Sequence, residues 1–207
     1  MTKIGIIHVG IGNIRSVYNA FFVQGWDAEV VSRPEDLALC SHLVLPGVGN
    51  FKRAIQIIED EGYKGPLSNF AKSGKPILGI CLGMQLFAES SKEGGLSDGL
   101  SFISGSVEKF SSNSGLPVPH VGWNAVTQRK SHPVFSGVSN EKDFYFVHSF
   151  HYIPRENETI LTETNYGQKF VSAIAKANVV GVQFHPEKSQ KNGLKIIDNF
   201  ALWDGQW

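Results

Sequence analysis

The chain has 207 residues, and its 19 lysines and arginines balance 19 aspartates and glutamates, so the formal net charge is zero. This balance gives no support to a nucleic-acid-binding or membrane-surface protein, because binding to polyanions usually requires a basic excess. With 42% hydrophobic and 18% charged residues, the chain is too apolar to be disordered, which predicts one globular domain over residues 1–207.

The cysteine content points to a reducing compartment. Only Cys40 and Cys81 occur, so a disulfide scaffold is not expected. The chain opens without the basic start and long apolar run of a signal peptide. No apolar run reaches the roughly 18 to 20 residues needed to cross a bilayer. We therefore expect a soluble, cytoplasmic protein.

In the first half of the chain, short apolar runs alternate with amphipathic patterns. The run over residues 4–9 stops at Gly10-Ile11-Gly12-Asn13, which predicts a buried strand and a tight turn. Apolar residues then recur with helical spacing from Ile14, and Gly25 is placed to end that helix. The same reasoning predicts strands at 28–31, 42–45 and 76–80, and helices that begin at Phe51 and Leu82.

The second half is richer in strands, with candidate runs at 144–148, 159–162, 170–175 and 179–184 and a helix near 194–203. Segments 90–101 and 111–119 are rich in serine and glycine, which predicts loops. The alternation in the first half predicts an α/β fold, with a mostly parallel central sheet and helices on both faces. The later strands predict an antiparallel extension of this sheet.

The sharpest local signal is Gly79-Ile80-Cys81-Leu82-Gly83, the cysteine counterpart of the G-x-S-x-G elbow, between an apolar strand and a helical pattern. A nucleophile on a strained strand-to-helix turn needs neighbours without Cβ atoms. The N-terminus of the following helix would favour a thiolate. The alternative is a small buried core cysteine, and this is the interpretation for Cys40, which has no such context.

A thiol nucleophile needs a base, and the best candidate is His185, at the end of an apolar strand. Because α/β proteins place their sites at the carboxyl ends of parallel strands, His185 and Cys81 are expected to converge at one sheet edge. In extended backbone, residues i and i+2 point the same way, which would bring Glu187 to one ring nitrogen of His185. The predicted site is a Cys-His-Glu triad.

Acyl transfer also needs N–H donors for the tetrahedral oxyanion. The segment Pro46-Gly47-Val48-Gly49 ends a predicted strand, and its glycines permit conformations that turn amides into a pocket.

Other patterns are weaker. The turn at 10–13 lacks the third glycine of a dinucleotide fingerprint, and His148 and His151 lack the acid of a zinc protease, so neither a metal nor a cofactor is expected. Trp123 and the aromatic segment that contains Tyr145 are either core residues or anchors for a partner.

Taken together, these motifs resemble a known family. The sequences PGVGNF at 46–51, GICLGMQ at 79–85 and HPEKS at 185–189 are similar to those of class I, triad-type glutamine amidotransferases, which have a flavodoxin-like fold. Within that family, PHVGWN at 119–124 and YFVHSF at 145–150 resemble the glutaminase subunits of imidazole glycerol phosphate synthases. The resemblance covers nearly the whole chain.

The resemblance implies a role for each matching residue. Cys81 would attack the side-chain amide of glutamine, His185 would carry the proton to the departing ammonia, and Glu187 would orient His185. Water would then hydrolyse the thioester to glutamate. The oxyanion donors would be Gly47, Val48, Gly49 and Leu82, and the substrate-binding residues would be Gly49, Gln85, Ser149 and Phe150.

The resemblance also implies a partner, a (β/α)₈-barrel cyclase subunit that forms a heterodimer with the glutaminase and receives its ammonia. Such complexes make imidazole glycerol phosphate and an aminoimidazole carboxamide ribotide, for histidine and purine synthesis. The residues that match the docking face are Asn13, Trp123 and Tyr145. Many members carry Asp-Tyr-Gly close to this face, whereas the present chain has His8-Val9-Gly10.

Three alternatives to a glutaminase subunit of this kind remain open at the level of the sequence. A paralogous glutaminase could feed ammonia to surface-sugar amidation, because its motifs overlap almost completely with those found here. A non-catalytic scaffolding subunit would be expected to lack a triad residue, and all three are present. A stand-alone cysteine hydrolase need not carry Gln85 or the PHVGWN segment, which weigh against it.

Overall fold

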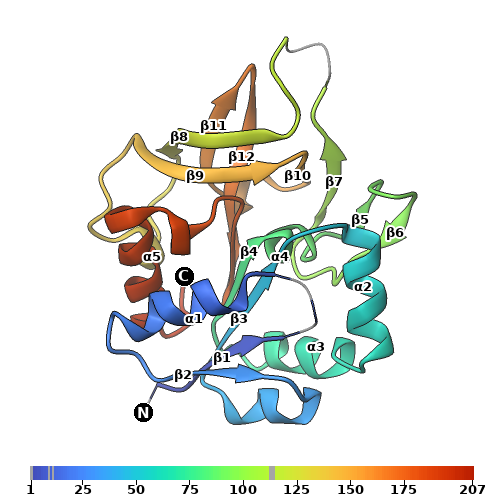
Figure 1. Cartoon of the computed structure of the whole chain (residues 1–207), viewed down its shortest axis with the longest axis vertical. Helices are drawn as coiled ribbons and strands as arrows, with labels where there is room; N and C mark the ends of the chain where they lie inside the picture. The colour runs from blue at the N-terminus through green and yellow to red at the C-terminus, as the bar shows by residue number, and fades with distance from the viewer. Residues whose placement is uncertain (1, 9, 11, 112–114) are drawn as a thin grey trace.

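Five parallel strands form the centre of one large sheet (Figure 1). The computed structural model describes residues 2–8, 10, 12–111 and 115–207. The central strands run in the order β2-β1-β3-β4-β13, with bounds Ala28–Val31, Ile4–Ile7, His42–Gly47, Ile77–Cys81 and Val179–Val182. Strands β4 and β13 are neighbours in space although about half of the chain separates them in sequence.

Helices cover both faces of this parallel core (Figure 1). Alternate strand residues point to opposite faces, so Val44 of β3 packs with one apolar cluster and Leu43 and Leu45 pack with the other. The first cluster contains the buried faces of α1 (Ile14–Phe22) and α5 (Gln190–Leu202). The second contains those of α2 (Phe51–Asp60) and α3 (Lys64–Lys72). The predicted α/β architecture is confirmed.

An antiparallel extension continues the sheet beyond β13. Strands β12 (Gln168–Lys176), β10 (Phe150–Pro154) and β7 (Gly105–Lys109) follow in antiparallel pairs. A second branch leaves β12 through β11 (Ile160–Tyr166), β8 (His120–Gln128) and β9 (Lys142–His148). This branch stands at the end of the sheet where the parallel strands finish (Figure 1).

Several expectations are corrected in detail. The segment expected as a loop at 90–101 contains β5 (Ser90–Ser91) and β6 (Ser97–Asp98), which pair with each other. The helix expected from Leu82 is a single turn, α4 (Leu82–Gln85), because the chain turns back to join β5. The strand expected at 179–184 ends at Val182. Val9, Ile11 and part of the loop at 111–119 lie outside the described residues.

The remaining elements are 3₁₀ turns, at Pro34–Leu39 (η1), Pro133–Phe135 (η3), Asn157–Thr159 (η4) and Pro186–Lys188 (η5). In the described ranges, no helix has the length and apolar character required to span a membrane.

Candidate functional site

Cys81 occupies a strained turn between β4 and α4. Its backbone has φ 54° and ψ −109°, a combination that residues with a Cβ rarely adopt. The flanking glycines permit this turn to pack closely against its surroundings. A Cβ on Gly83 would lie 1.7 Å from the carbonyl oxygen of Leu45, and one on Gly79 would lie 2.6 Å from the ring of Phe87. The expected elbow is therefore present.

The ends of neighbouring strands bring His185 to the same edge. Val182 of β13 is paired with Ile80 of β4, so the chain leaves both strands side by side. The backbone N–H of His185 donates to the carbonyl of Tyr145 at 2.9 Å, which fixes the histidine against β9. The hydroxyl of Ser189 strengthens this junction, since it donates to the carbonyl of His185 at 2.6 Å and accepts from the N–H of Tyr145.

His185 and Glu187 form a buried pair, although the geometry differs from the one expected. Nδ1 of His185 lies 2.8 Å from Oε1 of Glu187, and the two side chains are 3% and 2% exposed. The backbone between them is not extended. Pro186–Lys188 forms a 3₁₀ turn, closed by the N–H of Lys188 on the carbonyl of His185 at 3.1 Å. The proline at the start of this turn favours it, because its fixed φ suits a helical turn.

The environment of His185 favours its protonated form. Burial alone would lower its pKa, but Cys81 and the Glu187 carboxylate outweigh burial and raise the pKa from 6.5 to about 10. Cys81 has the larger effect of the two groups that raise this pKa, and no other described residue bonds to Nε2. Nε2 is the ring nitrogen that remains available for proton exchange with Cys81.

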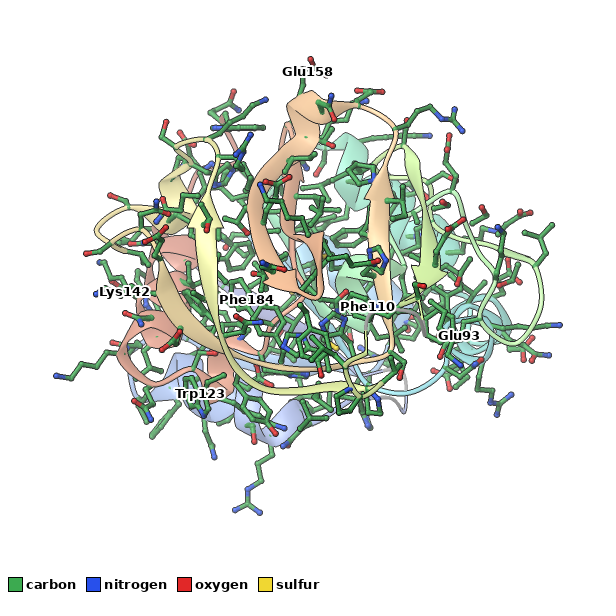
Figure 2. The ribbon with its side chains drawn as sticks, turned by 90° about the horizontal axis from the view of Figure 1, so that it is seen from above. Glu93, Phe110, Trp123, Lys142, Glu158 and Phe184 are labelled. Carbon is green, nitrogen blue, oxygen red and sulfur yellow. The ribbon has the colours of Figure 1, made fainter. Side chains whose placement is uncertain are left out.

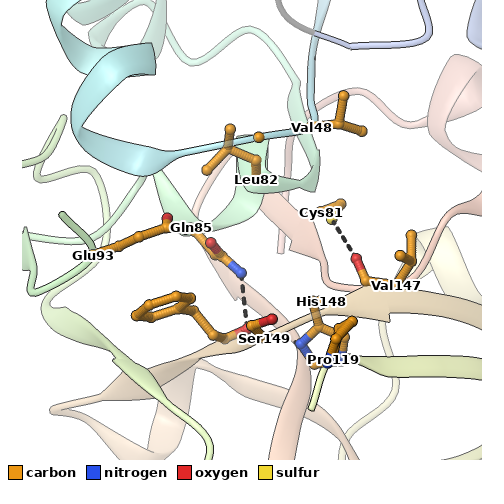
Figure 3. A pocket seen from close by; sticks show the side chains of 11 residues that line it. Val48, Cys81, Leu82, Gln85, Glu93, Pro119, Val147, His148 and Ser149 are labelled. Atoms are coloured by element: carbon orange, nitrogen blue, oxygen red, sulfur yellow. Dashed lines mark hydrogen bonds between the residues drawn. The ribbon is translucent and has the colours of Figure 1, made fainter.

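A cavity of about 280 Å³ opens in front of Cys81 (Figure 3). Its lining comes from the strand ends and from the loops above them. The lining residues are Val48, Gly49, Cys81, Leu82, Gln85, Glu93, Pro119, Val147, His148, Ser149 and Phe150. Cys81 contributes its thiol, which is directed to the carbonyl of Val147 at 3.8 Å. The cavity is large enough for a small metabolite and places that metabolite against the sulfur.

The residues expected to supply oxyanion donors lie around this sulfur. Gly47 is the register partner of Cys81 across β3 and β4 and is buried beneath the turn. Gly49 has φ 113°, a conformation open to glycine, and Val48, Gly49 and Leu82 line the cavity. All four predicted residues are therefore adjacent to the nucleophile candidate.

Gln85 has a defined orientation on the cavity wall. Its Nε2 donates to the carbonyl of Phe150 at 3.0 Å (Figure 3). The same nitrogen donates to Oε1 of Gln183 at 3.0 Å. These bonds use both amide hydrogens, so Oε1 is the atom that Gln85 can offer to a ligand, as an acceptor. Ser149 and Phe150, to which the resemblance assigns substrate binding, also line the cavity.

Two residues with ionisable side chains in the cavity lining were not expected from the sequence. Glu93, in the turn between β5 and β6, accepts a hydrogen bond from the N–H of Phe51 at the start of α2, at 2.8 Å. Burial raises the pKa of Glu93, and this N–H partly offsets the rise. No local pattern identifies Glu93, because its position depends on where the short β5–β6 hairpin folds.

The second is His148, a residue whose sequence context argues against a metal site. Its Nδ1 donates to the carbonyl of Phe150 at 2.8 Å, and its Nε2 therefore accepts from Nδ1 of His120 at 3.0 Å. Burial lowers the pKa of His148 to about 3 and that of His120 to about 4. Both rings are neutral and support the cavity wall.

The three residues expected at a docking face are only partly brought together. Trp123 and Tyr145 are register partners on β8 and β9, and their rings meet edge to face at 5.9 Å. Trp123 is 47% exposed and lies at the margin of the molecule, whereas Phe184 lies within it (Figure 2). Asn13 is exposed and caps α1 by accepting from the N–H of Ser16.

Cys40 is buried beside Glu29, and burial raises the pKa of its thiol to about 11.

Comparison with known proteins places this geometry in a family. The family model described as glutamine amidotransferase class-I matches residues 7–203. The chain is 44% identical over 199 residues to imidazole glycerol phosphate synthase subunit HisH 1 of Campylobacter jejuni subsp. jejuni serotype O:23/36 (strain 81-176), covering 96% of this chain and 98% of that protein. It is also 44% identical over 203 residues to subunit HisH of Methanosarcina barkeri, covering 97% and 98%.

Solved structures support the fold. PurLQS from Thermotoga maritima superimposes with a TM-score of 0.74 at 16% identity, over 96% of this chain and 97% of that one. A glutamine amidotransferase from Thermotoga maritima superimposes with a TM-score of 0.67 at 17% identity, over 95% and 81%. At these identities the similarity establishes the α/β architecture alone.

Proposed function

The chain belongs to the class-I glutamine amidotransferase family, and from this premise we propose that it hydrolyses glutamine to glutamate and ammonia through a thioester on Cys81. The whole chain, residues 1–207, acts as one amidotransferase domain in the cytoplasm. The observation that carries the proposal is the convergence of Cys81, which lines a cavity of about 280 Å³, with the buried His185–Glu187 pair.

The triad divides the chemistry in the following way. The Cys81 thiolate attacks the side-chain carbonyl carbon of glutamine, and the carbonyl oxygen becomes an oxyanion. The oxyanion collapses, the C–N bond breaks, and the His185 imidazolium gives its Nε2 proton to the departing nitrogen. Glu187 holds Nδ1 at 2.8 Å and so keeps Nε2 directed at the reacting atoms. Neutral His185 then takes a proton from water, which attacks the thioester and releases glutamate.

The oxyanion is stabilised by main-chain N–H groups from two adjacent segments. Gly47 is the last residue of β3, Val48 and Gly49 follow it, and Leu82 is the first residue after the nucleophile. The positive φ of Gly49 supports this role, because glycine can reorient its peptide groups at low cost. Loss of one such donor typically slows acyl transfer by roughly 10² to 10³.

Charge complementarity supports glutamine as the substrate. Glu93 places a carboxylate in the cavity, suited to the α-ammonium group, and Gln85 presents an acceptor oxygen to the same group or to the side-chain amide. Ser149 and Phe150 line the same cavity, which supports a role for them in holding the backbone of the bound amino acid.

We further propose that the ammonia passes to a (β/α)₈-barrel cyclase subunit in a heterodimer that acts in histidine biosynthesis. Two relatives that are 44% identical over nearly their whole length are imidazole glycerol phosphate synthase subunits, which supports this acceptor. The docking face includes Asn13, Trp123 and Tyr145. An exposed Trp123 packed edge to face on Tyr145 has the character of an interface anchor.

The test is glutamate release from glutamine by the purified chain, alone and with a barrel cyclase plus its nucleotide ligand, with Cys81→Ala as the blank. The proposal predicts release that requires Cys81 and that the cyclase stimulates. Release without stimulation would contradict the histidine-pathway assignment. No release under any of these conditions would contradict the glutaminase assignment.

A further inference from the structure

Gln183 is a fully buried glutamine between the nucleophile and the cavity wall. It follows β13, its side chain has no solvent exposure, and its backbone N–H is held by the carbonyl of Ser172 at 2.9 Å. Neither the triad nor the cavity lining includes it. A buried amide must satisfy its polar atoms inside the protein, so its partners indicate its role.

The orientation of the Gln183 amide follows from a main-chain carbonyl. The Phe150 carbonyl can only accept hydrogen bonds, so the atom of Gln85 that lies 3.0 Å from it must be Nε2. The same nitrogen lies 3.0 Å from Gln183, so the facing atom of Gln183 must be the acceptor Oε1. Nε2 of Gln183 is then directed at the sulfur of Cys81, at 3.6 Å.

We propose that Gln183 is a positioning residue that holds the Cys81 sulfur and the Gln85 amide in one unit, with its N–H donating to the thiolate. An N–H donor can stabilise the thiolate but offers nothing to the proton of the thiol. A hydrogen bond to a charged acceptor is stronger than one to a neutral acceptor, so this contact favours the ionised nucleophile. The inference rests on the proposed function in that Cys81 is the nucleophile.

The oxygen of the Gln183 amide orients Gln85, which lines the cavity. Gln183 Oε1 occupies one of the two hydrogens of Gln85 Nε2, and the Phe150 carbonyl occupies the other. The acceptor oxygen of Gln85 is thereby fixed toward the cavity. Gln183 thus sets two properties, the ionisation of Cys81 and the presentation of Gln85, and two substitutions separate them.

Gln183→Met has a side chain of similar length but makes neither hydrogen bond. Gln183→Glu retains an oxygen that accepts from Gln85, but it places a second oxygen where the N–H donor to the sulfur had been. The assay is the rate of alkylation of the purified full chain by iodoacetamide as a function of pH, with Cys81→Ala as the background. Cys40 adds little to that background, because the pKa of its thiol is raised to about 11. Gln128→Met is the matched control, since its amide donates to the Val138 carbonyl at 2.8 Å, in a different part of the fold.

The inference predicts that both Gln183 variants shift the alkylation profile upward by about one pH unit, which slows alkylation roughly tenfold at any given pH on the rising limb of the profile. Gln183→Met also raises the KM for glutamine several-fold, whereas Gln183→Glu leaves KM close to the parental value. Gln128→Met leaves both properties unchanged. If Gln183→Met does not fold, the alkylation profile of Gln183→Glu decides.

A parental alkylation profile in a folded Gln183 variant would overturn the inference, as would a lowered melting temperature with no change in profile or KM. The proposed function fails on a different result, namely glutamine hydrolysis by Cys81→Ala. The two failures are therefore distinguishable.

Discussion

Replacement of Glu187 by glutamine tests how a buried carboxylate controls the charge of His185. The substitution conserves size, and it changes a charge-assisted hydrogen bond of 2.8 Å between two side chains that are 3% and 2% exposed into a neutral one. Hydrogen bonds to charged groups contribute about 1.5 to 3 kcal/mol, roughly twice the value for neutral pairs. The difference, about 0.8 to 1.5 kcal/mol lost from the transition state, lowers kcat by roughly four- to twelvefold.

The pH dependence gives a second, independent readout. Glu187 is one of the groups that raise the pKa of His185 to about 10, so its removal lowers that pKa. The imidazolium that protonates the departing ammonia is then lost at lower pH. We expect the alkaline limb of kcat to move to lower pH in Glu187→Gln, with KM for glutamine nearly unchanged because Glu187 is not part of the cavity lining.

The same shift affects stability with a defined sign. The folded pKa of His185 lies above its unfolded value of about 6.5, so protonation stabilises the fold fully below that pH and the contribution is lost as pH rises toward 10. In Glu187→Gln we expect the folded protein to lose less stability between pH 6 and pH 10 than the parental chain does. Glu156→Gln is the control, because Glu156 pairs with Lys176 at the surface and its charge contributes at most about 1 kcal/mol. Unchanged kcat and an unmoved alkaline limb in Glu187→Gln would refute this account of the pair.

Three other predictions follow from the geometry. Gly83→Ala should abolish hydrolysis and lower the free energy of unfolding by about 3 kcal/mol, because its Cβ would lie 1.7 Å from the Leu45 carbonyl oxygen. Gly65→Ala on α3 is the control in thermal unfolding, because its Cβ would enter open space and should not destabilise the chain. Trp123→Ala should weaken cyclase binding about thirtyfold in a titration, with little change in melting temperature. Trp207→Ala, at a tryptophan that is also half exposed, should leave the affinity unchanged. Equal affinities for the two variants would show that Trp123 is not an interface anchor. Glu93→Gln should raise the KM for glutamine roughly tenfold with a smaller effect on kcat, and an unchanged KM would remove Glu93 from substrate recognition.

The sequence predicts the convergence of Cys81 and His185 because parallel strands finish at one edge of their sheet. Hydrophobic runs locate β4 and β13, and the elbow and the histidine directly follow them. That these two strands are neighbours does not follow from the runs themselves, since strand order depends on the whole topology. The expectation of a shared edge is sufficient here because each residue is close to its strand end.

The local geometry of the His185–Glu187 pair could not be predicted in the same way. An extended backbone and a 3₁₀ turn both bring residues i and i+2 within reach of a hydrogen bond, and the proline decides in favour of the turn. Glu93 was missed because a two-residue hairpin pairing carries it to the first turn of α2, where the N–H of Phe51 needs an acceptor. Gln183 was missed because a single polar residue beside an apolar strand gives no pattern.

The central claim is that glutamine hydrolysis proceeds through a thioester on Cys81. The most direct measurement is the mass of the chain after acid quenching during turnover with glutamine, followed by peptide mapping. We predict a glutamyl adduct on the peptide that contains Cys81, with none on the peptide that contains Cys40 and none in Cys81→Ala. Glutamate formation without that adduct in the parental chain, or any glutamate formation by Cys81→Ala, would contradict the account.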